Sequence, residues 1–99
     1  MSQVENVPAE EWAEWSKERG VTILDVREPD EWELGTLPGV LRISVGEIIE
    51  RVEEIDSSKP VLVVCRSGGR SMQVAEYLAA NGYETANLDG GMKALGMQE

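Results

Sequence analysis

Residues 60–71, Pro-Val-Leu-Val-Val-Cys-Arg-Ser-Gly-Gly-Arg-Ser, decide how the 99-residue sequence folds. Val61 to Cys65 is the longest apolar run in the chain, and its β-branched residues predict a buried strand. Residues 71–81 predict a helix that ends at Gly82. The apolar stripe of this helix comprises Val74, Ala75, Leu78 and Ala79. The loop between them therefore joins the carboxyl end of a strand to the amino end of a helix.

The rest of the sequence alternates in the same way between short β-like runs and helical stretches. The predicted strands cover residues 21–26, 40–43, 60–65 and 83–88. The predicted helical segments cover residues 8–19, 28–32, 44–55 and 71–81, with a short helical tail after residues 89–91. Ser44 and Glu47 have the spacing of a capping box at the start of the third segment. This order predicts an α/β domain with a mainly parallel sheet.

Length and composition favour one globular domain spanning residues 1–99, with 41% hydrophobic and 28% charged residues and no internal repeat. The longest apolar run is far shorter than the roughly 20 residues of a membrane span. The first residues lack the basic and apolar segments of a secretory signal, so we expect a cytoplasmic location. A net charge of −10 argues against general binding to nucleic acids or anionic membranes.

Cys65 is the only cysteine, so it cannot form an intrachain disulfide, and a chain without histidine offers it no zinc site. We therefore expect a free thiol and neither a metal nor a cofactor. Ligands of open parallel sheets bind at the carboxyl ends of the strands, where Cys65 is predicted to lie. Gly68 and Gly69 allow backbone amides to converge on an anion, and Arg66 and Arg70 add positive charge. These groups, with the amino end of the following helix, should lower the pKa of the thiol.

An inert cysteine that caps a buried strand is the plain alternative for any lone cysteine. Two arginines and a diglycine beside Cys65 favour the reactive interpretation, because an inert thiol needs none of them. A phosphate-binding loop would require Gly-Lys-Ser or Gly-Lys-Thr, which this loop lacks.

The cysteine loop resembles that of the rhodanese family, and three further motifs extend the similarity over almost the whole chain. They are Leu24-Asp25-Val26-Arg27-Glu28, Gly35-Thr36-Leu37-Pro38-Gly39 and Leu88-Asp89-Gly90-Gly91-Met92. The resemblance implies a five-stranded parallel sheet flanked by helices. It also implies a thiosulfate sulfurtransferase in which Cys65 attacks the outer sulfur of thiosulfate or a persulfide donor. The resulting persulfide would pass its sulfur to cyanide, a thiol or a protein acceptor.

The resemblance further implies roles for other residues. Arg66 and Arg70 would attract the small anionic donor, whereas amides or hydroxyls would come from Ser67, Gly68, Gly69 and Ser71. Asp25 and Arg27 match a signature near the site, and we expect a structural role for both, with Arg27 paired to Glu31 within one turn and Asp25 hydrogen-bonded to the neighbouring loop. Relatives often have His at the position of Thr36 and Trp near that of Leu95, so local packing should differ here.

Two other functions remain open at the level of sequence. Phosphatases and arsenate reductases of this fold have a Cys-x5-Arg loop, whereas Cys65 and Arg70 give the shorter Cys-x4-Arg, which suits a sulfur atom better than a phosphate. Noncatalytic binding modules of this fold often lack the cysteine, so the presence of Cys65 favours an enzyme.

Overall fold

The computed structural model describes residues 4–96, so both ends of the predicted 1–99 domain lie outside the described residues. These residues form a five-stranded sheet with the order β1-β5-β4-β2-β3. The strands are β1 (Val4–Val7), β2 (Thr22–Asp25), β3 (Leu41–Arg42), β4 (Val61–Val64) and β5 (Thr85–Leu88). Every pairing is parallel, which confirms the predicted α/β class with a parallel sheet.

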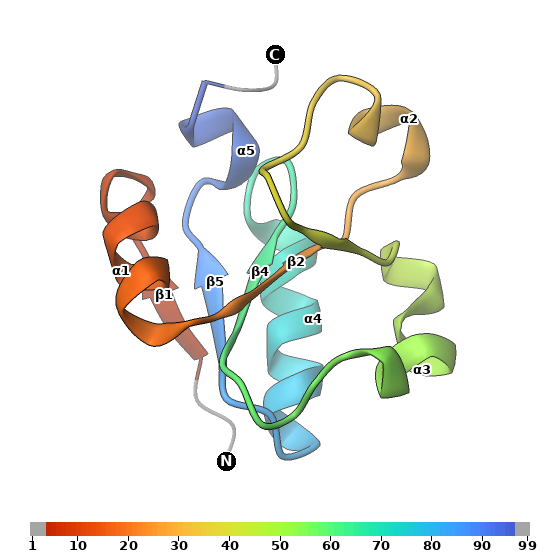
Figure 1. The fold of residues 1–99 in the computed structure, drawn as a ribbon. Helices are drawn as coiled ribbons and strands as arrows, with labels where there is room; N and C mark the ends of the chain where they lie inside the picture. Colours follow the sequence, from red (N-terminus) through yellow and green to blue (C-terminus); the bar gives the residue numbers. More distant parts are fainter. Residues whose placement is uncertain (1–3, 97–99) are drawn as a thin grey trace.

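Helices cover both faces of the sheet (Figure 1). One face carries the 3-10 turn η1 (Ala9–Glu11), α1 (Trp12–Arg19) and α5 (Gly91–Ala94). The other carries η2 (Val45–Glu47), α3 (Ile48–Arg51), η3 (Val52–Glu54) and α4 (Gly69–Ala80). The short helix α2 (Pro29–Trp32) follows β2. Within residues 4–96, no helix combines the length and the apolar character needed to cross a membrane.

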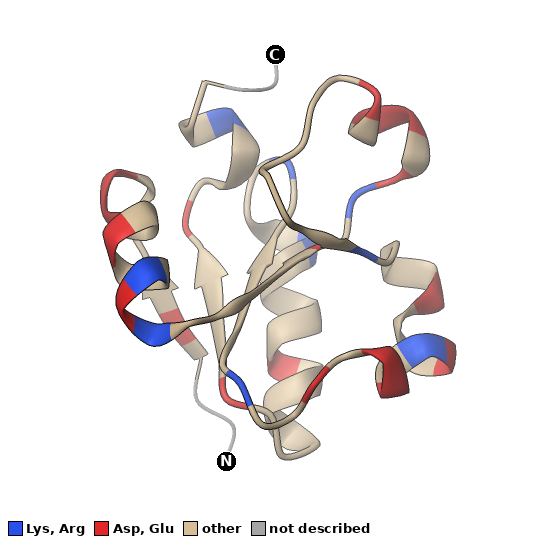
Figure 2. Ribbon diagram, viewed as in Figure 1, with Lys and Arg blue, Asp and Glu red and all other residues tan. Residues whose placement is uncertain are grey.

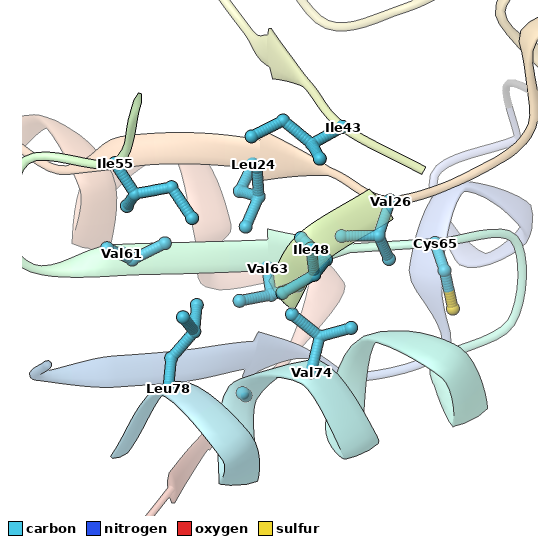
Figure 3. Close-up of a cluster of buried hydrophobic side chains, with 11 residues drawn as sticks. Leu24, Val26, Ile43, Ile48, Ile55, Val61, Val63, Cys65, Val74 and Leu78 are labelled. Carbon is cyan, nitrogen blue, oxygen red and sulfur yellow. The ribbon is translucent and has the colours of Figure 1, made fainter. Parts of the chain in front are cut away.

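The central strand β4 is buried on both faces and contributes alternate residues to two apolar clusters. Val61, Val63 and Cys65 point to the α3/α4 face, where they pack with Val26, Ile48, Val74 and Leu78 (Figure 3). Leu62 and Val64 point to the α1/α5 face, where Trp12 and Trp15 pack against them and their neighbours. Burial on both faces explains why this strand has a continuous apolar sequence.

The edge strand β1 was not among the strands predicted from periodicity. It pairs with β5 in the register Val4 to Thr85 and Val7 to Leu88. Only Val7 is buried, so the segment has no apolar run of its own. Its conformation is set by hydrogen bonding to β5, which a local pattern does not reveal.

The prediction of one continuous helix over residues 44–55 is wrong, because η2, α3 and η3 divide this segment. The predicted capping box is absent as well, since the Ser44 hydroxyl donates to the Arg27 carbonyl at 3.0 Å. At the other end, the Tyr83 hydroxyl lies 3.1 Å from the Val52 carbonyl and 3.2 Å from that of Ile55. Tertiary hydrogen bonds therefore take backbone and side-chain groups that a continuous helix would use.

Candidate active site

Cys65 lies directly after β4, with its sulfur on the side of the sheet that α4 covers (Figure 3). The side chain is buried. The Gly68 amide donates to Sγ at 3.0 Å, and the Ser71 Oγ lies 3.3 Å from Sγ. The loop thus curls back on the thiol, and the start of α4 supplies a second donor.

The two glycines of the loop have different roles. Gly68 has φ 105°, a value that favours glycine, and it forms the N-cap of α4. Gly69 has no positive φ and is the first residue of α4, so the helix begins two residues before the predicted start at Ser71. The backbone amides that converge on the thiol therefore require unusual backbone geometry at Gly68 but not at Gly69.

Hydrogen bonds at Sγ determine the acidity of the thiol. Burial raises the pKa of Cys65, but hydrogen bonds from the Ser71 hydroxyl and from the amides of Ser71, Gly68 and Ser67 outweigh it, so the net pKa is lowered. The predicted lowering of this pKa is thus supported, and its main causes are hydrogen bonds from neutral donors, with a charge interaction between Arg70 and the thiolate beside them. The arrangement favours a thiolate, the nucleophilic form of cysteine.

A chain of polar side chains extends from the thiol across the sheet. Ser71 Oγ also contacts Asn87 Oδ1 in a short hydrogen bond, and Asn87 Nδ2 donates to Asn6 Oδ1 at 3.0 Å. Asn87 is buried in β5, and Asn6 belongs to β1. Sequence reasoning missed Asn87, although an asparagine within the buried segment 85–88 was a usable signal, because buried amides need partners.

The diglycine turn after β5 holds the first part of the cysteine loop. Met92 N donates to the Cys65 carbonyl at 2.8 Å, and Lys93 N donates to the Arg66 carbonyl at 2.9 Å. A Cβ on Gly91 would lie 2.4 Å from the Cys65 carbonyl oxygen. Gly90 and Gly91 both have positive φ, which forms a tight turn that contacts the cysteine loop directly.

Asp25 and Arg27 form a fully buried ion pair, with Arg27 Nη2 2.8 Å from Asp25 Oδ2. Arg27 also donates from Nη2 to the Gly35 carbonyl at 2.7 Å and from Nη1 to the Glu31 carbonyl at 3.2 Å. These bonds attach the 31–35 segment to the carboxyl end of β2. Arg27 thus forms its ion pair with Asp25 and contacts Glu31 at the backbone carbonyl, whereas the Glu31 carboxylate forms an ion pair with Arg70.

The two arginines of the loop have different surroundings. Arg66 is exposed, as is Ser67. Arg70 forms a two-pronged ion pair with Glu31, at 2.7 Å for Nη1 to Oε1 and 2.9 Å for Nη2 to Oε2. Sequence reasoning placed Glu31 beside Arg27 but missed its carboxylate as the partner of Arg70, which lies 39 residues further along the chain.

The fold and the site together are a parallel sheet with a hydrogen-bonded cysteine at the carboxyl ends of its strands, and comparison with known proteins gives the family. The sequence model of the rhodanese-like domain matches residues 8–98, so the chain is a member of the rhodanese-like domain family. Two curated relatives carry sulfurtransferase names, which assigns the chain to a sulfurtransferase family.

YtwF of Bacillus subtilis, which bears a provisional name as a sulfurtransferase, is 43% identical over 72 residues, or 73% of this chain and 70% of YtwF. The thiosulfate sulfurtransferase GlpE of Pseudomonas syringae is 31% identical over 94% of this chain and 88% of its own length. The structure of reduced CoADR-RHD from Bacillus anthracis superimposes with a TM-score of 0.88 and 33% identity. That match covers 95% of this chain but 17% of the larger one, so the fold also occurs within longer proteins.

Proposed function

We propose that this protein is a sulfurtransferase of the rhodanese type, with Cys65 as its nucleophile, acting as a single domain. The observation that carries the proposal is the contact of Cys65 Sγ with the Gly68 amide and the Ser71 hydroxyl, which lowers the thiol pKa. The similarity to GlpE supports thiosulfate as one donor. No metal or cofactor takes part in the proposed reaction.

In the first half of the reaction, the Cys65 thiolate attacks the outer sulfur of the donor. A new S–S bond forms, the bond between the two donor sulfurs breaks, and sulfite leaves with the electron pair. In the second half, cyanide or an external thiolate attacks the terminal sulfur, and the Cys65 thiolate leaves. The acceptor must come from outside, because the chain has no second cysteine.

The loop donors are proposed to hold negative charge in both halves. Burial raises the pKa of the thiol, and the amides of Ser67, Gly68 and Ser71 lower it. The same amides would also stabilise the terminal sulfur of the persulfide. Gly69 is proposed to contribute its amide from the first turn of α4. Arg66 is exposed and is proposed to attract the anionic donor.

Intact mass spectrometry tests the proposal directly. Incubation with thiosulfate should add the mass of one sulfur atom to the protein, and cyanide should remove it as thiocyanate. Cys65→Ser should acquire no sulfur. The proposal fails if the wild-type protein stays unmodified with thiosulfate and with a persulfide donor. Hydrolysis of an aryl phosphate would then favour the phosphatase alternative, and loss of both activities would favour a noncatalytic binding module.

A further inference from the structure

The ion pair between Glu31 and Arg70 joins α2 to the cysteine loop. Both oxygens of the Glu31 carboxylate contact terminal nitrogens of Arg70, at 2.7 and 2.9 Å. Two parallel hydrogen bonds of this kind are the strongest arrangement between arginine and a carboxylate. An oxyanion that uses the same two nitrogens must therefore displace Glu31.

Glu31 is held firmly in this position. Its Oε1 also accepts a hydrogen bond from the Glu28 amide at 2.9 Å, which completes a capping box at the start of α2. Its backbone carbonyl accepts from the buried Arg27 side chain. The Glu31 side chain is only 15% exposed, so little water screens its charge. The carboxylate is thus a fixed charge beside the loop.

The net charge around the thiol is consequently more negative than the two arginines of the loop suggest, because Glu31 offsets Arg70. The hydrogen bonds that Arg70 donates to the Glu31 carboxylate are the main cause that raises the pKa of Arg70, and the charges of Cys65 and Glu28 also contribute. The guanidinium therefore interacts with the thiolate and with two carboxylates at once. Figure 2 shows several acidic segments in and beside α2.

We propose that Glu31 is a specificity-determining residue that disfavours doubly charged sulfur donors relative to donors with one negative charge or none. This inference rests on the proposed function of Cys65. Thiosulfate carries two charges, whereas an organic thiosulfonate carries one. Each gives the same persulfide on Cys65, with sulfite or a sulfinate leaving with the electron pair. The second charge of thiosulfate is repelled by Glu31 while Arg70 is already neutralised.

Steady-state kinetics with thiosulfate and benzenethiosulfonate, with cyanide as the acceptor, test this selection. Glu31→Gln removes the charge and retains an oxygen that can accept from the Glu28 amide. It should raise the ratio of kcat/KM for thiosulfate to that for benzenethiosulfonate by about fivefold or more, mainly through the KM for thiosulfate. Glu33→Gln, which removes an exposed charge next to α2, should change the ratio by less than about twofold.

Alkylation provides a second measurement that does not require sulfur transfer. Cys65 is the only cysteine, so the rates of its reaction with iodoacetate and iodoacetamide can be read from intact mass. The two reagents have nearly the same size, so access to the buried sulfur cancels in the ratio. Glu31→Gln should raise the iodoacetate-to-iodoacetamide ratio by about threefold or more at low ionic strength, and added salt should reduce the difference.

The outcomes separate this inference from the proposed function. The role of Glu31 would be overturned if Glu31→Gln changed neither the kcat/KM ratio nor the alkylation ratio, or if it lowered the relative use of thiosulfate. Turnover of the donors in the same assays would still support the sulfurtransferase assignment. A raised alkylation ratio without turnover of either donor would confirm charge selection at Cys65 and reject the proposed reaction. Thermal unfolding followed by circular dichroism should show that Glu31→Gln and Glu33→Gln are both folded at the assay temperature.

Discussion

At the scale of single residues, the thiol of Cys65 is subject to two opposing effects. Burial favours the neutral thiol, and a set of neutral hydrogen-bond donors favours the thiolate. The donors prevail, so the pKa is lowered without direct contact to a positive charge. The Ser71 hydroxyl is the side-chain donor of this set and the largest influence that lowers the pKa.

Ser71→Ala should therefore raise the pKa of Cys65. The thiolate fraction at neutral pH would fall, and the rate of alkylation by iodoacetamide at pH 7 should decrease roughly three- to tenfold. The rate should be measured against pH, with a midpoint that moves upward. Ser67→Ala keeps the backbone amide and removes only an exposed hydroxyl, so its profile should match that of the wild type. An unchanged midpoint in Ser71→Ala would contradict the assignment.

Single residues also mark the limits of sequence reasoning. Cys65 and its loop were recognisable because the apolar run and the glycines are contiguous in the sequence. Glu31 and Asn87 were not recognisable, because only the fold brings them to the loop. Glu31 lies 39 residues before its partner Arg70, and Asn87 lies 16 residues after its partner Ser71. Ser44 was assigned a capping role from local spacing, but its hydroxyl donates to the Arg27 carbonyl 17 residues earlier.

At the scale of elements, the turn that leads into α5 holds the cysteine loop in place through backbone hydrogen bonds. The amides of Met92 and Lys93 bind the carbonyls of Cys65 and Arg66. Gly91 is placed so close to these carbonyls that no side chain fits. The position of the nucleophile therefore depends on an element that contributes no side chain to the thiol contacts described above.

Gly91→Ala should destabilise the protein and disturb the loop. Its Cβ would approach two carbonyl oxygens at 2.4 and 2.6 Å, in a backbone conformation with φ 60°. We expect a loss of about 3 kcal/mol or more in the free energy of unfolding, measured with urea, and slower loading with sulfur.

Gly96→Ala is the matched control for the backbone conformation. Gly96 has φ 74°, but a Cβ there would meet no atom within 4 Å. It should cost about 1–2 kcal/mol from the positive φ alone. Equal losses in the two variants would show that contact with the loop carbonyls contributes nothing.

At the scale of the whole molecule, the strands of the sheet could be predicted in part, but not their order. Apolar runs located four strands, and the family resemblance supplied the total of five. The fifth strand, β1, could not be located from periodicity because Val4-Glu5-Asn6-Val7 gains its order from pairing with β5. Likewise, the division of residues 44–55 follows from contacts with Tyr83 and Arg27, which lie in other parts of the chain.

Deletion of residues 1–7 should test how far the sheet depends on β1. The deletion removes the buried Val7 and the parallel pairing with β5, so the free energy of unfolding should fall by about 2 kcal/mol or more. Urea denaturation is the measurement. Deletion of residues 1–3 leaves β1 whole and serves as the control. Equal stability of the two truncated proteins would mean that β1 adds nothing to the fold.

The position of Ser71 between Cys65 and Asn87 means that two acceptors compete for one hydroxyl proton. A hydroxyl carries one proton, so Ser71 cannot donate to Sγ and to Asn87 Oδ1 at the same time. While Cys65 is a thiol, Ser71 can donate to Asn87. Once Cys65 ionises, we expect the hydroxyl proton of Ser71 to turn toward the sulfur. Ionisation of the nucleophile should therefore leave Asn87 Oδ1 without the Ser71 donor, while the bond from Asn87 Nδ2 to Asn6 uses another atom and can persist.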